Sequence, residues 1–115
     1  MGVANSLNKG NKFNFTIPEN FKYKKLSELV QENGYDYVYR VNAVYINTRS
    51  KYGNAPVIAT DCELVNLPNH LMPICEHIRS DKDCIEAINN GTLGFKIYSY
   101  QRGTATYYSV NWVDL

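Results

Sequence analysis

The most regular hydrophobic pattern in this chain lies near its end, in residues 93–113. Two runs rich in aromatic and β-branched residues flank Arg102-Gly103, which predicts a β-hairpin. Directly opposed residues share one face of a sheet, so pairing Gln101 with Thr104 gathers the apolar residues on one side. That side carries Leu93, Phe95, Ile97, Tyr108, Val110 and Trp112. We expect it to face the core and to bury Trp112.

The opposite face of this hairpin is unusual for a surface in water. It carries tyrosines beside cations, and the hairpin has no carboxylate before Asp114. Tyrosine is flat, rigid and half polar, so it stacks on nucleobases or fills protein interfaces, although it is also simply common in strands. The residues on this face are Lys96, Tyr98, Tyr100, Tyr107, Ser109 and Asn111, with Arg102 at the tip.

Residues 35–48 predict a strand much longer than the usual five or six residues. Neither the odd nor the even positions of this stretch are apolar from end to end. A long strand whose inward face changes partway is expected to contain a bulge or a sharp bend. The sequence places that change between Val41 and Ala43.

Shorter elements occupy the rest of the chain. Apolar spacing predicts one helix within 23–32, strands at 56–60 and 63–67, and two helices between Asn69 and Asn90, capped by Asn69 and Ser80. Residues 1–20 are rich in Asn, Gly, Ser and Lys and predict a flexible N-terminal arm. The length of 115 residues then leaves one compact domain at 21–115.

The predicted order over 35–114 is three strands, two helices and two strands, which is the order of the oligonucleotide-binding (OB) fold. The chain resembles the small OB-fold single-stranded DNA-binding proteins of phages and mobile elements. Residues 46–60, with a basic aromatic loop between two strands, and the Tyr- and Lys-bearing strands near the end carry this resemblance. It implies a mainly β fold with helices: a five-stranded OB-like Greek-key barrel with two short helices between strands 3 and 4.

In that family, bases stack on aromatic residues of the strands and phosphates meet cations of the loops. The resemblance therefore implies largely sequence-independent binding of single-stranded DNA, or of RNA. The expected nucleic-acid-binding residues are Tyr98, Tyr100, Tyr107, Lys96, Arg102, Arg49 and Lys51, together with Tyr52 and Tyr45, whose facing the pattern does not set.

The net charge of +1 is not that of a strongly basic nucleic-acid binder, but the charge is uneven. Residues 1–25 carry five lysines and one glutamate, whereas 61–90 carry six carboxylates and two cations. A second hypothesis is a protein-binding module of a phage or mobile element, such as an inhibitor of a host enzyme. Tyrosine and arginine also dominate protein interfaces, and the acidic region could mimic DNA. The sequence does not decide between the two hypotheses, and an oligomer is possible under either.

Three cysteines without a CxxC spacing predict free thiols and a reducing compartment, and hence the cytoplasm. No apolar run approaches the roughly 20 residues of a membrane span, so we expect no membrane partner. The spacing of His70, Cys75 and His77 matches no zinc motif. Phosphate-binding glycine loops and hydrolase motifs are missing as well. We therefore expect no metal, no cofactor and no enzymatic activity.

Overall fold

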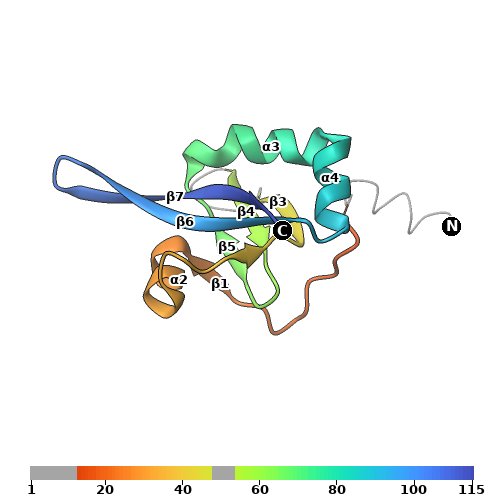
Figure 1. The fold of residues 1–115 in the computed structure, drawn as a ribbon, viewed down its shortest axis with the longest axis horizontal. Coiled ribbons are helices and arrows are strands. Elements are labelled where there is room, and N and C mark those ends of the chain that lie inside the picture. The colour runs from red at the N-terminus through yellow and green to blue at the C-terminus, as the bar shows by residue number, and fades with distance from the viewer. Residues whose placement is uncertain (1–12, 48–53) are drawn as a thin grey trace, which may run out of the picture.

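A computed structural model describes residues 13–47 and 54–115 and shows a mixed α/β fold (Figure 1). The described part contains a four-stranded sheet, a three-stranded sheet and three α-helices. In chain order the elements are β1 (Tyr23–Lys25), α2 (Leu26–Asn33), β2 (Tyr39–Arg40), β3 (Ala43–Asn47), β4 (Ala55–Ala59), β5 (Leu64–Asn66), the 3-10 turn η1 (Asn69–Leu71), α3 (Met72–Ser80), α4 (Lys82–Asn89), β6 (Leu93–Arg102) and β7 (Ala105–Asp114). None of the helices in these two ranges is long and apolar enough to cross a membrane.

The long strand predicted at 35–48 begins later than expected and bends where the pattern changes. Residues 35–38 form no strand, β2 pairs with β6, and β3 pairs with β4. The switch falls between two neighbours: the Val41 amide donates to the carbonyl of Leu93, and the Asn42 amide donates to the carbonyl of Ala59. One stretch of chain therefore belongs to both sheets, and the predicted bend at 41–43 is confirmed.

The predicted five-stranded Greek-key barrel does not close in the described residues, which form two separate sheets in the orders β1-β5-β4-β3 and β2-β6-β7. A closed barrel would need a free outer edge on β5. That edge is occupied by β1, which pairs with it in parallel from Tyr23 opposite Leu64. Residues 23–25 were predicted to start a helix. The local apolar spacing gave no sign of their strand partner, which lies about 40 residues later in the chain. The "mainly β" prediction is corrected to mixed α/β, because three α-helices accompany the two sheets in the described residues.

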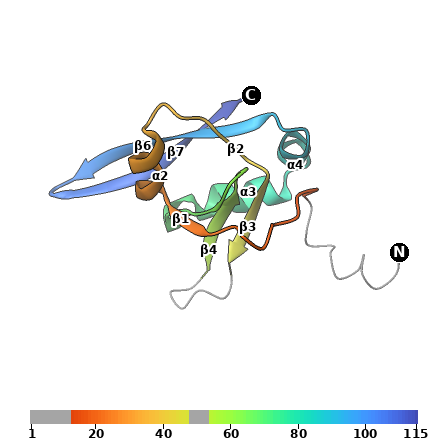
Figure 2. The same ribbon diagram turned by 90° about the horizontal axis from the view of Figure 1, so that it is seen from below.

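The predicted hairpin is present as β6 and β7, but its register differs by two residues. Arg102 pairs with Ala105, so the loop is Gly103-Thr104, with Gly103 at a positive φ of 61° that suits glycine. A shift of two residues keeps every side chain on its predicted face. Figures 1 and 2 both show the loop end of the hairpin projecting beyond α2 and α3.

The inner face of the hairpin supplies the centre of the core. Phe95 is fully buried, stacks on Tyr39 with ring centroids 5.1 Å apart, and meets Trp112 edge-on at 6.3 Å. Trp112 lies opposite Phe95 rather than Leu93, and it is half-buried at the edge of the core. Within the region predicted as an arm, Phe13 is buried against Tyr45, while residues 1–12 lie outside the described part.

The two helices predicted between the third and fourth strands of the OB order are α3 and α4, and their starting residues need correction. Asn69 opens η1, and α3 begins at Met72 with Pro73 in its first turn, where a missing N–H is tolerated. Ser80 is the last residue of α3. The cap of α4 is Asp81, whose side chain accepts from the amides of Asp83 and Cys84.

Candidate nucleic-acid interface

The outer face of the hairpin brings three predicted tyrosines together. Tyr100 and Tyr107 stack with ring centroids 5.7 Å apart and an interplanar angle of 24°. Tyr98 lies 6.2 Å from Tyr100 at a tilt of 36°. We call Tyr98, Tyr100 and Tyr107 the tyrosine ladder. It forms a continuous aromatic strip along the projecting part of the hairpin.

The ladder follows directly from strand geometry. Tyr98 and Tyr100 are two residues apart on β6 and therefore share a face, and Tyr107 is the cross-strand partner of Tyr100. Tyr98 is 39% exposed and Tyr107 46% exposed, whereas Tyr100 between them is half-buried. A core residue would be covered, so these exposed fractions show an aromatic surface that the folded chain leaves open to solvent.

The middle residue of the ladder, Tyr100, contacts His70, a residue that the sequence analysis considered only as a metal ligand and rejected. The His70 ring meets Tyr100 edge-on at 6.5 Å, and its Nε2 lies 3.1 Å from Oγ of the buried Ser109. This hydrogen bond fixes the imidazole beside the tyrosines. Thirty residues separate His70 from Tyr100, and no local pattern signals their contact.

Two of the predicted cations belong to the same face. Lys96 lies on it opposite Asn111 and is half-buried, and Arg102 is exposed at the end of β6. The predicted residues Arg49, Lys51 and Tyr52 lie outside the described residues.

Tyr45 is not brought into the ladder. It lies on β3 in the other sheet, half-buried, with its ring edge-on to Phe13 at 6.4 Å. Burial raises the pKa of its hydroxyl, and the nearby Arg79 charge lowers it by less. Its surroundings are those of a packing residue.

A groove of about 340 Å³ runs beside the ladder, where the two sheets fail to join. The free edge of β7 forms one wall through Thr106, Tyr107 and Tyr108. The other wall is formed by the ends of β1 and β5 and the residues that follow them: Lys25, Leu26, Ser27, Asn66, Leu67 and Pro68. Lys25 adds a cation that the sequence did not assign to the site, because Tyr23–Lys25 was expected to be helical.

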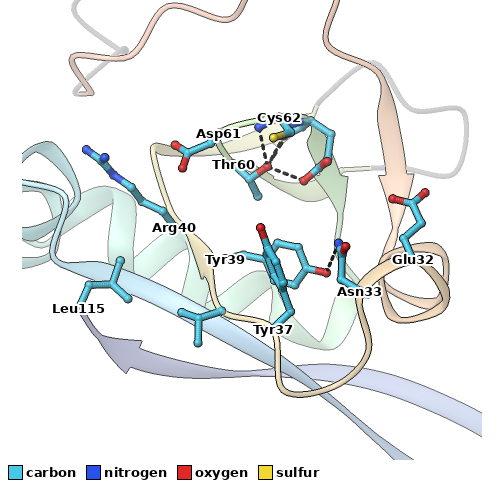
Figure 3. A pocket seen from close by; sticks show the side chains of 11 residues that line it. Glu32, Asn33, Tyr37, Tyr39, Arg40, Thr60, Asp61, Cys62 and Leu115 are labelled. Carbon is cyan, nitrogen blue, oxygen red and sulfur yellow. Dashed lines mark hydrogen bonds between the residues drawn. The ribbon is translucent and has the colours of Figure 1, made fainter.

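A second cavity, of about 360 Å³, lies near the end of the chain and has a different character (Figure 3). Its lining includes the carboxylates of Glu32, Asp61 and Glu63 against the single cation Arg40. The Thr60 hydroxyl donates to a Glu63 carboxylate oxygen at 2.6 Å. Because phosphates avoid carboxylates, this cavity does not suit a polyanion.

The three cysteines are all free, as predicted, and they differ in accessibility. Cys62 is exposed, Cys84 is half-buried and Cys75 is fully buried. Burial raises the pKa of the Cys75 thiol to about 12. This thiol stays protonated at physiological pH, which makes it a core residue and a poor nucleophile.

Comparison with protein-family models, curated proteins and solved structures finds no match for this chain. The geometry of the ladder, the cations beside it and the order of the strands are therefore the grounds on which its function is inferred.

Proposed function

We propose that this protein binds single-stranded DNA, or RNA, with little sequence preference, and that the tyrosine ladder is its base-stacking surface. The observation that carries the proposal is the ladder itself, with three tyrosines in ring contact on an exposed face of a projecting hairpin. Every nucleobase has a π-face, so stacking on tyrosine tolerates any sequence. Each stacked base contributes about 1–3 kcal/mol.

The cations beside the ladder suit the phosphates of a bound strand. Lys96 shares the face of the ladder, Arg102 stands at its outer end, and Lys25 lies in the groove next to Tyr107. The hairpin has no carboxylate before Asp114 to oppose them. A strand running along β6 and β7 would therefore find aromatic rings for its bases and positive charge for its backbone.

The order of neighbouring strands supports an OB-like domain. Without the edge strand β1, it runs β5, β4, the bent strand of β3 and β2, β6 and β7, and the helices α3 and α4 lie between β5 and β6 in the chain. OB folds bind oligonucleotides through the loops after strands 1 and 4. In this chain those connections are residues 48–54, which hold the predicted Arg49, Lys51 and Tyr52, and the hairpin loop at 103–104. The first connection holds predicted aromatic and basic residues, and the second directly follows the predicted Arg102.

The cellular location and the origin of the protein are also part of the proposal. Three free cysteines belong in a reducing compartment, so we assign the protein to the cytoplasm. An origin in a phage or mobile element follows the resemblance noted in the sequence and is part of the same proposal.

A protein-binding module is the second candidate function, and the groove beside β7 favours it. A free strand edge next to an apolar groove accepts an extended peptide by strand addition. Tyrosines are also frequent at the centres of protein interfaces. The two functions differ in their response to salt, because nucleic-acid affinity falls steeply as salt rises.

Fluorescence anisotropy with a labelled thymidine oligomer tests the proposal. Wild type should bind at low salt, and Tyr100→Leu should weaken binding by about 5- to 150-fold, the loss of one stacked base. Tyr37→Leu is the matched control, because Tyr37 is 50% exposed but lines the acidic cavity. If folded wild-type protein does not bind the oligomer at low salt, the proposal is wrong and the second candidate function, a protein-binding module, is favoured.

A further inference from the structure

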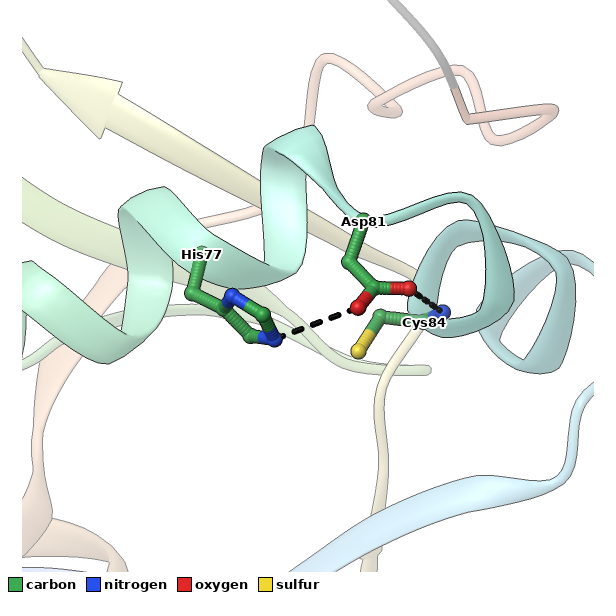
Figure 4. Close-up of side chains that lie close together, drawn as sticks. All are labelled: His77, Asp81 and Cys84. Carbon is green, nitrogen blue, oxygen red and sulfur yellow. Dashed lines mark hydrogen bonds and ion pairs between the residues drawn. The ribbon is translucent and has the colours of Figure 1, made fainter.

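The corner between α3 and α4 brings three metal-ligating side chains together (Figure 4). His77 lies in the last turn of α3, Asp81 links the two helices, and Cys84 lies in the first turn of α4. The Nε2 atom of His77 is 3.2 Å from Oδ2 of Asp81. The three ligand atoms, including Sγ of Cys84, lie within 4.8 Å of one another.

Asp81 is held in place by the fold itself. Its Oδ1 accepts hydrogen bonds from the amides of Asp83 at 2.8 Å and Cys84 at 3.2 Å, which cap α4. Its own amide donates to the carbonyl of His77 and closes α3. The cap occupies one carboxylate oxygen and directs the other toward His77, as an outer-shell hydrogen bond orients a metal ligand.

The distances suit a small tetrahedral ion. With zinc bonds of about 2.0 Å to nitrogen and oxygen and 2.3 Å to sulfur, tetrahedral ligands lie about 3.3–3.6 Å apart. The contact between His77 and Asp81 already has nearly this length. Cys84 is half-buried on the first turn of α4, and its Sγ lies within 4.8 Å of the other two ligand atoms.

The donor set and the local charge point to the same kind of ion. The imidazole and the thiolate favour zinc over magnesium or calcium, and zinc also accepts a carboxylate oxygen. The carboxylate of Asp83 adds a second negative charge beside Cys84. A divalent cation would neutralise this charge and stabilise the thiolate.

We propose that His77, Asp81 and Cys84 bind a divalent zinc-type metal ion, with water in the fourth position. The site is independent of the proposed nucleic-acid surface: the hairpin loop projects from one end of the molecule, and α4 lies toward the other (Figure 1). The expectation of no metal rested on the spacing of His70, Cys75 and His77. The structure instead joins His77 to Asp81 and Cys84 through the turn between the two helices.

Cobalt provides a spectroscopic test, because a thiolate bound to Co²⁺ gives a sulfur-to-metal charge-transfer absorption that an ion pair between His77 and Asp81 cannot produce. The full-length chain, treated with a chelator and kept reduced, is titrated with CoCl₂. We expect the charge-transfer band to appear in wild type and to vanish when ZnCl₂ displaces the cobalt. A wild type without this band at excess cobalt would overturn the proposal.

Two variants locate the site. Cys84→Ser should lose the band, while Cys62→Ser, which changes an exposed thiol outside the cluster, should keep it. His77→Ala changes an exposed side chain, and it should weaken cobalt binding by about 10-fold or more, since even outer-shell changes cost that much. A band that persists in Cys84→Ser, or cobalt affinity unchanged in His77→Ala, would contradict the assignment.

Discussion

Replacing Phe95 by alanine should destabilise the protein strongly, because the inner face of the hairpin is the centre of the core. Phe95 is fully buried between Tyr39 and Trp112. Removing a buried phenylalanine costs about 3–5 kcal/mol, from lost transfer energy and the cavity left behind. At about 2.1 cal/mol/K per residue, unfolding 115 residues has an entropy of about 240 cal/mol/K, so the melting temperature should fall by about 12–21 °C.

The matched control is Tyr98→Ala on the same strand and the opposite face. Tyr98 is 39% exposed, and its one ring contact within the described residues is with Tyr100, so its removal should cost about 1 kcal/mol, or about 4 °C. Thermal unfolding followed by circular dichroism measures both variants. Equal losses in the two variants would show that the tyrosine ladder belongs to the core, and the division of the hairpin into a packed and a free face would be wrong.

Two further predictions concern charge and protonation. Arg102→Gln should flatten the dependence of log affinity on log salt for a thymidine oligomer by about 0.7, one phosphate contact on a single strand, and an unchanged slope would exclude that contact. Burial raises the pKa of the Cys75 thiol from 9.0 to about 12. The contribution of this buried thiol to the free energy of unfolding is therefore fully present below about pH 9 and is lost as the pH rises toward 12. Urea unfolding under reducing conditions should show a loss of up to about 4 kcal/mol in the free energy of unfolding over this pH range. The loss should be smaller in Cys75→Val. An equal loss in wild type and Cys75→Val would show that other groups cause it.

The facing of the hairpin was predictable from the sequence because it depends only on parity. Alternation along β6 and β7 assigns each side chain to a face, and the two-residue error in register left Tyr98, Tyr100 and Tyr107 together. The bend near Val41 was predictable for a similar reason, since the apolar phase of the strand changes there. Patterns of this kind depend only on residues that are close in the sequence, so an error in the exact position of the turn does not change them.

Contacts between distant segments were not predictable in this way. The short strand β1 exists because it pairs with β5, and this pairing also prevents the barrel from closing. His70 joins the tyrosine ladder only through tertiary packing against Tyr100 and Ser109. The cluster of His77, Asp81 and Cys84 depends on the geometry of the turn between α3 and α4. The predicted cap of α4, Ser80, was one residue before the true cap, Asp81.

The most direct test of the proposed function is to map where a single strand meets the protein. Backbone amide ¹H–¹⁵N spectra of the full-length chain would be recorded at low salt during titration with a thymidine oligomer of about ten nucleotides. We predict that the changes concentrate on Tyr98, Tyr100, Tyr107 and His70, while the amides of α4 stay unchanged. Unchanged spectra, or changes confined to α4 or to the acidic cavity, would contradict binding through the tyrosine ladder.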